Sequence, residues 1–468
     1  MKRILLSLLL ASLGAIGCSA QRGGTVYEPV RFEDGTAVEG DEEAEALFAQ
    51  DRFVVDTTLL EKGDTLFTYR HAGAFVRLQL DGLPAGIDKI TLVPMEGALS
   101  EIPVTGSEAL SLWMAKEPGG VPAAAAFAQA PDGRVWSARL PALSLAPGTA
   151  YRWTGTLLPP ESPTSNLKAT PLTATLLDIE PGEYSGITHI SGNRYAVVDD
   201  NLKGGGILFF SIPLDSYGNV GSVRMQVADG TTQATGKARD CEGIAFEPST
   251  ATLYVSSENQ EIRGYDLAGK ENGKALRVPN DLGVKNIESN RGFEALTYNA
   301  ETGLFWTTTE SPLKKDTFLP RILRLQSFGA DGEPGERYLY QTGEPLRSSA
   351  NTQAYVFGVP ALAALDDGRL IVLEREVYVP RGGFWDKLSD SFTKIDLYLV
   401  DPVHDPAGIL RKSLLCSFRT GALDLANFEG MCLGPVLPDG ARTLLLIADS
   451  QKGSGGLTNE YVKVILLR

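Results

Sequence analysis

The stretch that decides the fold is Asp240-Cys241-Glu242-Gly243-Ile244-Ala245-Phe246, followed after a short turn by Leu253-Tyr254-Val255-Ser256-Ser257-Glu258. The two apolar runs are separated by Glu247-Pro248-Ser249-Thr250, whose residue types favour a turn. Two such runs around a turn are typical of a β-hairpin. The first run opens with an acidic residue and the second closes on another, so the predicted hairpin carries a carboxylate at each end.

The same pattern returns along the chain. Two further copies keep both acids, Phe293-Glu294-Ala295-Leu296 to Glu310 and Phe428-Glu429-Gly430-Met431 to Asp449. Two more copies keep only the closing acid, Tyr184-Ser185-Gly186-Ile187 to Asp199 and Val359-Pro360-Ala361-Leu362 to Glu374. A regular repeat of this kind indicates an architecture built from similar units.

Each predicted hairpin is followed by a third apolar run, and all but the last by a fourth. The last unit ends at Arg468, and Thr173–Leu177, which precedes the first hairpin, can supply its missing strand. Four-stranded units that close by pairing the two ends of the sequence are typical of a β-propeller. We count five blades, and six if one long loop hides a degenerate blade.

The composition agrees with an all-β protein. The chain has 468 residues, with 50 glycines and 27 prolines, and lacks long helical patterns. Its formal charge of -15 argues against nucleic acid as a partner, because that contact needs concentrated Lys and Arg. The acidity is compatible with cation binding but also serves solubility.

The N-terminus predicts export and lipidation. Lys2 and Arg3 precede an apolar run from Ile4 to Ile16, and Gly17-Cys18 follows, which is the order of an export signal. Ala15-Ile16-Gly17-Cys18 resembles the bacterial lipoprotein signal, in which the cysteine becomes the lipidated first residue. An ordinary cleaved signal with a chance cysteine is the alternative. Because no Asp follows Cys18, the resemblance to Gram-negative lipoproteins implies a lipid-anchored protein of the cell envelope, at the outer membrane, touching the membrane through its anchor only.

The chain divides into an export segment and two domains. Short alternating runs such as Ala74–Leu80 predict a β-sandwich, and the stretch from Ala74 to Pro94 resembles fimbrillin-like sandwich domains. The remaining cysteines, Cys241, Cys416 and Cys432, fit no zinc motif and are interpreted as core residues. The predicted boundaries are a signal peptide at 1–17, a lipidated tether at 18–50, the β-sandwich at 51–158, a linker at 159–170 and the β-propeller at 171–468.

The repeated acids predict a shared site. The start of the first strand and the end of the second lie side by side in a hairpin, which places Glu242 near Glu258, Glu294 near Glu310 and Glu429 near Asp449. Blade symmetry then brings the pairs to one face, where Glu374 and either Asp199 or Asp200 would join them from the other two blades. Several carboxylates repel one another unless a cation or protons neutralise them. Because Ca²⁺ prefers oxygen ligands, we predict a divalent cation here, with Ca²⁺ as the first choice.

Two alternative roles for the acids stay open. They could cap backbone N–H groups and hold neighbouring blades together, or they could form an acid/base site without metal. Arg239, Arg291 and Arg375 lie close to these acids in the sequence. Arginine forks suit an anionic substrate, phosphate above all, so we predict substrate contacts there; ion pairs with the same acids are the alternative.

Several site classes are excluded. The sequence has no Gly-x-Ser-x-Gly and no Gly-x-x-x-x-Gly-Lys-Ser/Thr, which removes the common serine esterase and nucleotide-hydrolysing motifs. Only His71, His189 and His404 are present, too scattered for a zinc site built from histidines.

A family resemblance joins these observations. It is carried by Asp240–Ala245, Ser257-Glu258, Gly292–Leu296, Thr309–Ser311 and Phe428–Met431. On these residues 173–468 resemble the bacterial phytase-like family described as having esterase-like activity of phytase. The resemblance implies an exported β-propeller that hydrolyses phosphoric or carboxylic esters. We therefore expect a lipoprotein that hydrolyses phosphoric or related esters with a divalent cation. The alternative is a cell-surface binding protein without catalysis, for a glycan or an anionic ligand.

Overall fold

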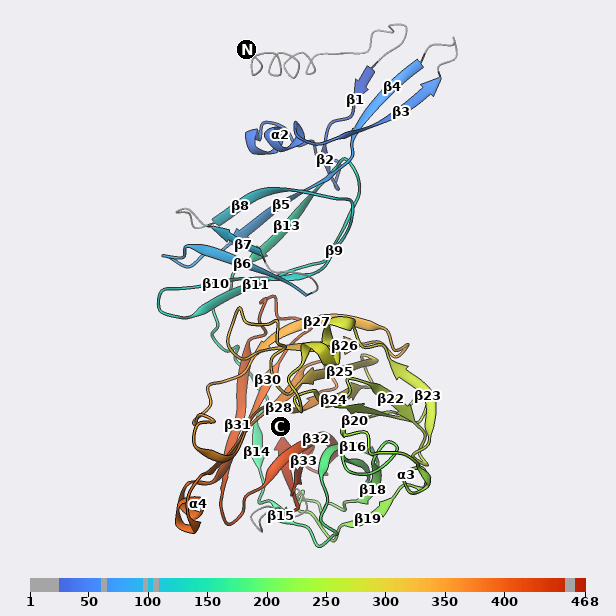
Figure 1. Ribbon diagram of the computed structural model, residues 1–468, viewed down its shortest axis with the longest axis vertical. Helices are drawn as coiled ribbons and strands as arrows, with labels where there is room; N and C mark the ends of the chain where they lie inside the picture. The colour runs from blue at the N-terminus through green and yellow to red at the C-terminus, as the bar shows by residue number, and fades with distance from the viewer. Residues whose placement is uncertain (1–24, 60–64, 96–99, 104–108, 451–458) are drawn as a thin grey trace.

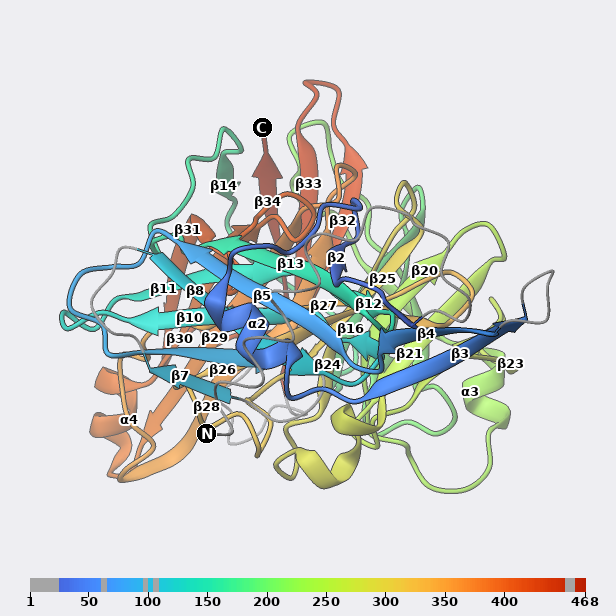
Figure 2. The ribbon, with the colours of Figure 1, turned by 90° about the horizontal axis from the view of Figure 1, so that it is seen from above.

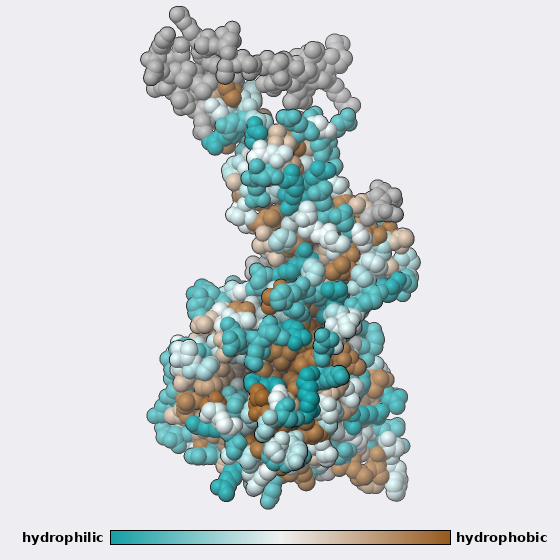
Figure 3. Space-filling model, turned by 180° about the vertical axis from the view of Figure 1, so that it is seen from behind, coloured by the Kyte–Doolittle hydropathy of each residue, from teal (hydrophilic) through white to brown (hydrophobic). Residues whose placement is uncertain are grey.

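The computed structural model describes residues 25–59, 65–95, 100–103, 109–450 and 459–468. These form two lobes, a smaller one from the first third of the chain and a larger one from the rest (Figure 1, Figure 3). Almost every regular element is a β-strand. Within the described residues, no helix has the length and apolar character needed to cross a membrane. The signal peptide and Cys18 lie outside the described residues, so their predicted roles stay predictions.

The smaller lobe is a β-sandwich. Its main sheets have the strand orders β11-β10-β6-β7 and β2-β13-β5-β8, and their facing sides bury Leu78, Leu92, Ala126 and Trp153. Side chains of β5 alternate because successive residues of a strand point to opposite faces. The elements of this lobe are β1 (Thr25–Tyr27), β2 (Arg31–Phe32), α2 (Glu42–Phe48), β3 (Phe53–Leu59), β4 (Thr65–His71), β5 (Ala74–Asp81), β6 (Lys89–Pro94), β7 (Ser100–Pro103), β8 (Ala109–Lys116), β9 (Gly119–Val121), β10 (Ala124–Gln129), β11 (Val135–Leu140), β12 (Leu143–Leu145) and β13 (Thr149–Thr156). The likeness to fimbrillin-like domains stays a prediction.

The predicted tether differs from the structure in its second half. Strand β2 joins the sandwich sheet, and Phe32 and Ala44 are buried against Phe75 and Trp113. Helix α2 begins at an Asp41 N-cap, whose carboxylate accepts from Ala44 N. The acidic composition of this stretch predicted a tether because only a few of its residues are apolar, and these few pack it against the sandwich.

The larger lobe consists of five sheets arranged as a β-propeller. Four of them follow sequence order, β16-β17-β18-β19, β20-β21-β22-β23, β24-β25-β26-β27 and β28-β29-β30-β31. The first strand of each sheet contacts the first strand of the next, and β32 contacts β16, so the first strands form a closed ring. We call each sheet a blade and number the blades from β16.

The elements of the larger lobe follow the repeat predicted from the sequence. They are β14 (Ala169–Pro171), β15 (Thr175–Leu176), β16 (Tyr184–Ser191), β17 (Arg194–Asp199), β18 (Ile207–Ser211), β19 (Arg224–Val227), α3 (Asp229–Gln233), β20 (Cys241–Glu247), β21 (Thr252–Ser257), β22 (Ile262–Tyr265), β23 (Glu271–Leu276), η1 (Asn280–Leu282), η2 (Val284–Asn286), β24 (Phe293–Asn299), β25 (Leu304–Thr309), β26 (Ile322–Phe328), β27 (Pro334–Gln341), β28 (Thr352–Ala364), β29 (Leu370–Pro380), α4 (Phe384–Asp390), β30 (Phe392–Val400), β31 (Lys412–Gly421), β32 (Asn427–Val436), β33 (Arg442–Asp449) and β34 (Tyr461–Leu467).

The last blade is closed by residues from both ends of the propeller sequence. Its order is β14-β34-β33-β32, with Thr170 paired to Leu466, and β15 also pairs with β34. The closure predicted from the sequence is therefore confirmed, with the pairing spread over two short strands. Cys241, Cys416 and Cys432 are free thiols, the first and last of them buried.

The sandwich lies directly against the third blade, and the view along the long axis shows its strands over the propeller (Figure 2). Val93 and Phe127 pack with Leu319, Ile322 and Leu339 in one apolar cluster. Two buried arginines cross the junction, since Arg324 and Arg337 each donate to the carbonyl of Met95, at 3.1 and 2.7 Å.

Candidate functional site

Each blade carries a β-bulge near the start of its first strand. The pairing is interrupted between Tyr184 and Gly186, Cys241 and Ile244, Phe293 and Ala295, Gly358 and Ala361, and Phe428 and Gly430. A bulge bends its strand and re-aims the extra side chain. The residues at the bulges are Ser185, Glu242, Glu294, Pro360 and Glu429, which are the opening positions of the sequence repeat.

Small residues after the bulges let the first strands approach one another. A Cβ on Gly186 would lie 2.4 Å from the carbonyl oxygen of Glu242, and one on Gly243 would lie 2.6 Å from that of Glu294. Such distances are shorter than real contacts, so only glycine fits without movement of the neighbouring backbone. The Glu-Gly pair of the repeat thus places a carboxylate and a close backbone contact side by side.

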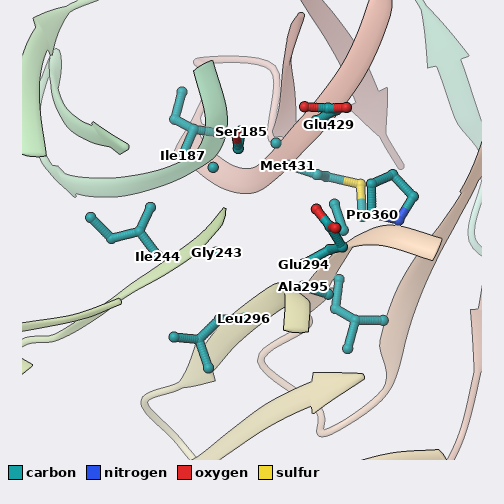
Figure 4. A pocket seen from close by; sticks show the side chains of 14 residues that line it. Ser185, Ile187, Gly243, Ile244, Glu294, Ala295, Leu296, Pro360, Glu429 and Met431 are labelled. Carbon is teal, nitrogen blue, oxygen red and sulfur yellow. The ribbon is translucent and has the colours of Figure 1, made fainter. Parts of the chain in front are cut away.

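The centre of the ring is nearly filled. A cavity of about 10 Å³ remains, lined by the first strands of all the blades, with Glu294 and Glu429 at its wall. In the close view, their carboxyl groups lie with Met431 and Pro360 between them (Figure 4). This space holds one water or ion at most. A larger molecule can meet these acids only from the mouth of the ring.

Two groups of acids share one residue. Ligand oxygens of Glu242, Glu258 and Glu294 lie within 4.8 Å of one another, and so do those of Asp200, Asp240 and Glu242. Glu242 is 7% exposed and, among the described residues, its carboxylate has no hydrogen-bond or ion-pair partner. Glu258 accepts a hydrogen bond from Gly292 N at 3.1 Å. We call these five residues the open half of the acidic ring.

Burial and mutual repulsion raise the pKa values in the open half. Burial and then contact with Glu183 raise the pKa of Asp200 to about 9. The pKa values of Glu242 and Glu294 lie well above the usual range, first because of burial and then because of nearby carboxylates. Burial also raises the pKa of Glu258. Without a cation, these groups therefore retain protons at pH values where carboxyls are normally ionised.

The other half of the ring contains its own cation. The guanidinium of Arg375 forms ion pairs with Glu310 and Glu429, and it donates to Asn427 Oδ1 at 2.9 Å. Asn427 in turn donates to Glu429 at 2.9 Å and to Asp449 at 3.4 Å. Arg375 is 3% exposed. We call Glu310, Glu429, Asp449 and Arg375 the paired half of the ring.

The prediction for Glu374 differs from the structure, and the register of the fourth blade gives the reason. In the first, third and fifth blades, the residue after the bulge pairs with Val198, Thr308 and Ile447 of the second strand, respectively. Two residues further along the chain from these partners are Asp200, Glu310 and Asp449. In the fourth blade Ala361 pairs with Leu373, so Arg375 takes that position.

Glu374 consequently points away from the ring. A shift of one residue along a strand moves a side chain to the opposite face. The carboxylate of Glu374 bonds to Tyr340, Lys412 and Gly343 N, the last at 2.8 Å, between the third and fourth blades. The structure therefore places Glu374 outside the acidic ring, away from the predicted cluster of acids.

The arginines predicted to contact substrate have three different placements. Arg239 lies outside the ring and bonds to Tyr265 and Glu271 at the outer strands of its blade, so the structure does not bring it to the acids. Arg375 is too deeply buried to meet a substrate and belongs to the ring itself. Arg291 pairs with Glu310, and its side chain is 30% exposed, which places it at the mouth.

The sequence left Asp199 or Asp200 open for the first blade, and the predicted site residues lack Asp240. Asp240 begins the repeat unit, and its φ of 56° is the left-handed conformation that aspartate tolerates better than most residues. Asp200 is the closing residue of its blade, one position beyond Asp199, whose carboxylate instead accepts from Asn201 N at 3.0 Å. The acidic character was visible in the sequence, whereas the register that selects one of two adjacent aspartates was not.

Comparison with known families gives a match over most of the propeller. Residues 179–451 match the phytase-like family described as "Esterase-like activity of phytase". The chain belongs to this family. The match confirms the resemblance inferred from the repeat, and it covers the open and paired halves of the ring but none of the sandwich. No curated protein shows significant similarity to the chain.

Two solved propeller structures are similar at low scores. The WD40 β-propeller domain of Doa1 has a TM-score of 0.29 and 9% identity, covering 64% of this chain and 97% of that one. The streptogramin B lyase structure has a TM-score of 0.27 and 11% identity, with coverage of 64% and 98%. The β-propeller architecture of this phytase-like chain rests on its own strand pairing and ring of first strands.

Proposed function

We propose that this phytase-like protein hydrolyses phosphoric or related esters at the mouth of the propeller, with a divalent cation held by the open half of the ring. The observation that carries the proposal is Glu242, a buried carboxylate that has no partner among the described residues and belongs to both acidic groups. A buried unpaired carboxylate is costly, and a bound cation removes that cost.

The residues fit such a cation. The candidate ligand atoms are all carboxylate oxygens, which suit a hard cation such as Ca²⁺ rather than a metal that prefers nitrogen or sulfur. Glu242, Glu258 and Glu294 would hold it, and Asp200 and Asp240 form a second group that shares Glu242. When bound, the cation would supply Lewis-acid polarisation of an ester oxygen and a lowered pKa of water.

The protein's own residues would orient the substrate. Arg291 offers further guanidinium donors beside its pair with Glu310, and its position at the mouth suits the anionic group of an ester. The narrow ring centre would keep the substrate outside, so the reacting group would approach the acids from the loops. Among the described basic side chains predicted from the sequence, Arg291 alone combines exposure with contact to the ring.

The test uses purified protein on generic phosphate and carboxylic ester substrates, with and without chelator. We expect hydrolysis that is lost after exhaustive chelation, restored by Ca²⁺, and lost in Glu242→Gln. Glu301→Gln is the matched control, because Glu301 is exposed at the turn of the third hairpin. Activity that survives chelation would overturn the metal mechanism. No activity on either ester class would favour the binding function instead.

We also propose that the protein is exported and lipid-anchored at Cys18, on the strength of the signal-like N-terminus. Cys18→Ser should abolish acylation and move the protein from the membrane fraction to the soluble fraction. Labelling with a fatty-acid analogue and fractionation check this. Unchanged labelling and partitioning of the variant would contradict it.

A further inference from the structure

The fourth blade breaks the acidic repeat in a specific way. The position that holds Asp200, Glu310 and Asp449 in three other blades holds Arg375 in this one, as the strand register shows. We propose that Arg375 is a permanent internal counter-ion that occupies a second cation site of the ring and so confines divalent cations to the open half. The inference deepens the proposed function, and it rests on the proposed cation site for its wild-type reference.

The contacts of Arg375 are those expected of a cation at the meeting point of several acids. Its two terminal nitrogens reach Glu310 of the third blade and Glu429 of the fifth, and one of them also reaches Asn427. One carboxylate from each of the two blades that flank the fourth blade thus contacts the same positive charge. Asp449 is linked to the same group through Asn427.

Arginine is suited to this place because its charge cannot be removed. Its guanidinium stays protonated in proteins, and its planar fork matches carboxylates. Burial lowers the pKa of Arg375, but Glu429, Glu310 and Glu294 raise it by more. A lysine or a bound metal ion could be lost with pH or chelation, whereas this cation remains while the chain is folded.

Removing the guanidinium would leave an arrangement like the open half. Glu310 is 2% exposed, and it and Glu429 would then share a buried space with Glu294 and without a cation deep in the ring. Arg291 would remain as a single partner of Glu310 at the mouth. Carboxylate oxygens from the third and fifth blades around such a space are the ligands that a hard divalent cation takes.

A purely structural role predicts a different result. If Arg375 only holds blades together, its removal destabilises the protein and changes no binding stoichiometry. The number of cations bound therefore separates the two roles, because an ordinary ion pair between blades does not affect it.

The experiment compares Arg375→Met with wild type by equilibrium dialysis and calorimetry with Ca²⁺, on protein purified in the presence of Ca²⁺. We expect Arg375→Met to bind one more equivalent of Ca²⁺ and to show a larger Ca²⁺-induced rise in melting temperature. Lys412→Met is the matched control, since Lys412 pairs with the buried Glu374 outside the ring. It should lose stability without binding an additional ion.

Two results would overturn the inference. One is an Arg375→Met variant that binds the same number of ions as wild type with the same rise in melting temperature. The other is an Arg375→Lys variant that binds more Ca²⁺ than wild type. This variant keeps the positive charge, so it also provides a folded test if Arg375→Met does not fold. Failure of the proposed function is distinguishable, because wild type would then bind no cation whereas Arg375→Met would still gain one.

Discussion

The two halves of the acidic ring are built by the same repeat and reach opposite electrostatic states. In the open half, Asp200, Glu242 and Glu294 have raised pKa values, and Glu242 has no partner in the described chain. In the paired half, Glu310 and Glu429 both form ion pairs with Arg375, and Glu310 also pairs with Arg291. Much of the difference arises from Arg375, the side chain that stands in place of an acid in the fourth blade. It shows that a symmetric scaffold confines a site to part of its ring by a single change of charge.

The largest expected effect is a difference in stability between Glu310→Gln and Glu242→Gln. Glu310→Gln leaves Arg375 short of a buried partner and should lower the free energy of unfolding by about 3–5 kcal/mol. Glu242→Gln removes an unpaired buried acid and should leave the metal-free protein equally or more stable. Denaturant unfolding in chelator measures both.

The exposed control Glu301→Gln should change the free energy of unfolding by less than about 0.5 kcal/mol. Equal losses in Glu310→Gln and Glu242→Gln would erase the proposed distinction between the halves.

The second expected effect concerns cation affinity. Glu242→Gln, Glu258→Gln and Glu294→Gln should each weaken Ca²⁺ binding by more than about tenfold, or about 1.4 kcal/mol. Glu429→Gln should weaken it less, because Glu429 is paired with Arg375. Isothermal titration calorimetry gives the affinities. If only Glu429→Gln lost Ca²⁺ affinity, the cation would lie in the paired half, which would contradict the prediction.

The third expected effect is a pH dependence of the metal-free protein. Raised pKa values mean that the folded protein holds protons that the unfolded chain releases, so stability is present below the unfolded pKa and falls as pH rises. For Asp200 this window runs from about 4 to about 9. In chelator we expect the melting temperature to fall across this range, and Ca²⁺ should reduce the fall. A melting temperature that rises with pH in chelator would contradict the raised values.

The smallest expected effect compares two arginines. Arg291→Ala should raise KM for a phosphate ester by about three- to tenfold, equal to roughly 1 kcal/mol, because it removes donors at the mouth. Arg239→Ala should leave KM unchanged, since Arg239 bonds to Tyr265 and Glu271 away from the ring. Steady-state kinetics decide between them. Equal effects of the two variants would remove Arg291 from the substrate contacts.

The repeat made the fold predictable, because apolar runs, turns and closing acids recur with little change from Tyr184 to Asp449. The count of strands predicted that the two ends of the propeller sequence pair with each other. The repeat did not predict in which direction individual side chains point. The choice between Glu374 and Arg375 depends on a bulge that spans Val359 and Pro360, and a sequence pattern does not show where two strands lose register.

Further differences also have local causes. Arg239 precedes an opening glutamate by three residues, as Arg291 does, yet it bonds to Tyr265 and Glu271 on the outer strands of its blade, whereas Arg291 pairs with Glu310. The docking of residues 31–48 depends on Phe32 and Ala44, too few apolar residues to outweigh an acidic stretch. Asp200 and Asp199 are adjacent and chemically identical, so only the paired backbone distinguishes them.

The closure of the last blade has a consequence for the time order of folding. Thr170 pairs with Leu466, so the two partners are separated by almost the whole propeller sequence. Contacts this distant in sequence form slowly, because a long chain must first be brought into a loop. Synthesis from the N-terminus delivers β34 last, after both halves of the acidic ring have been made. The last blade, and with it the closed ring of first strands, is therefore complete only after β34 has paired with β14 and β33.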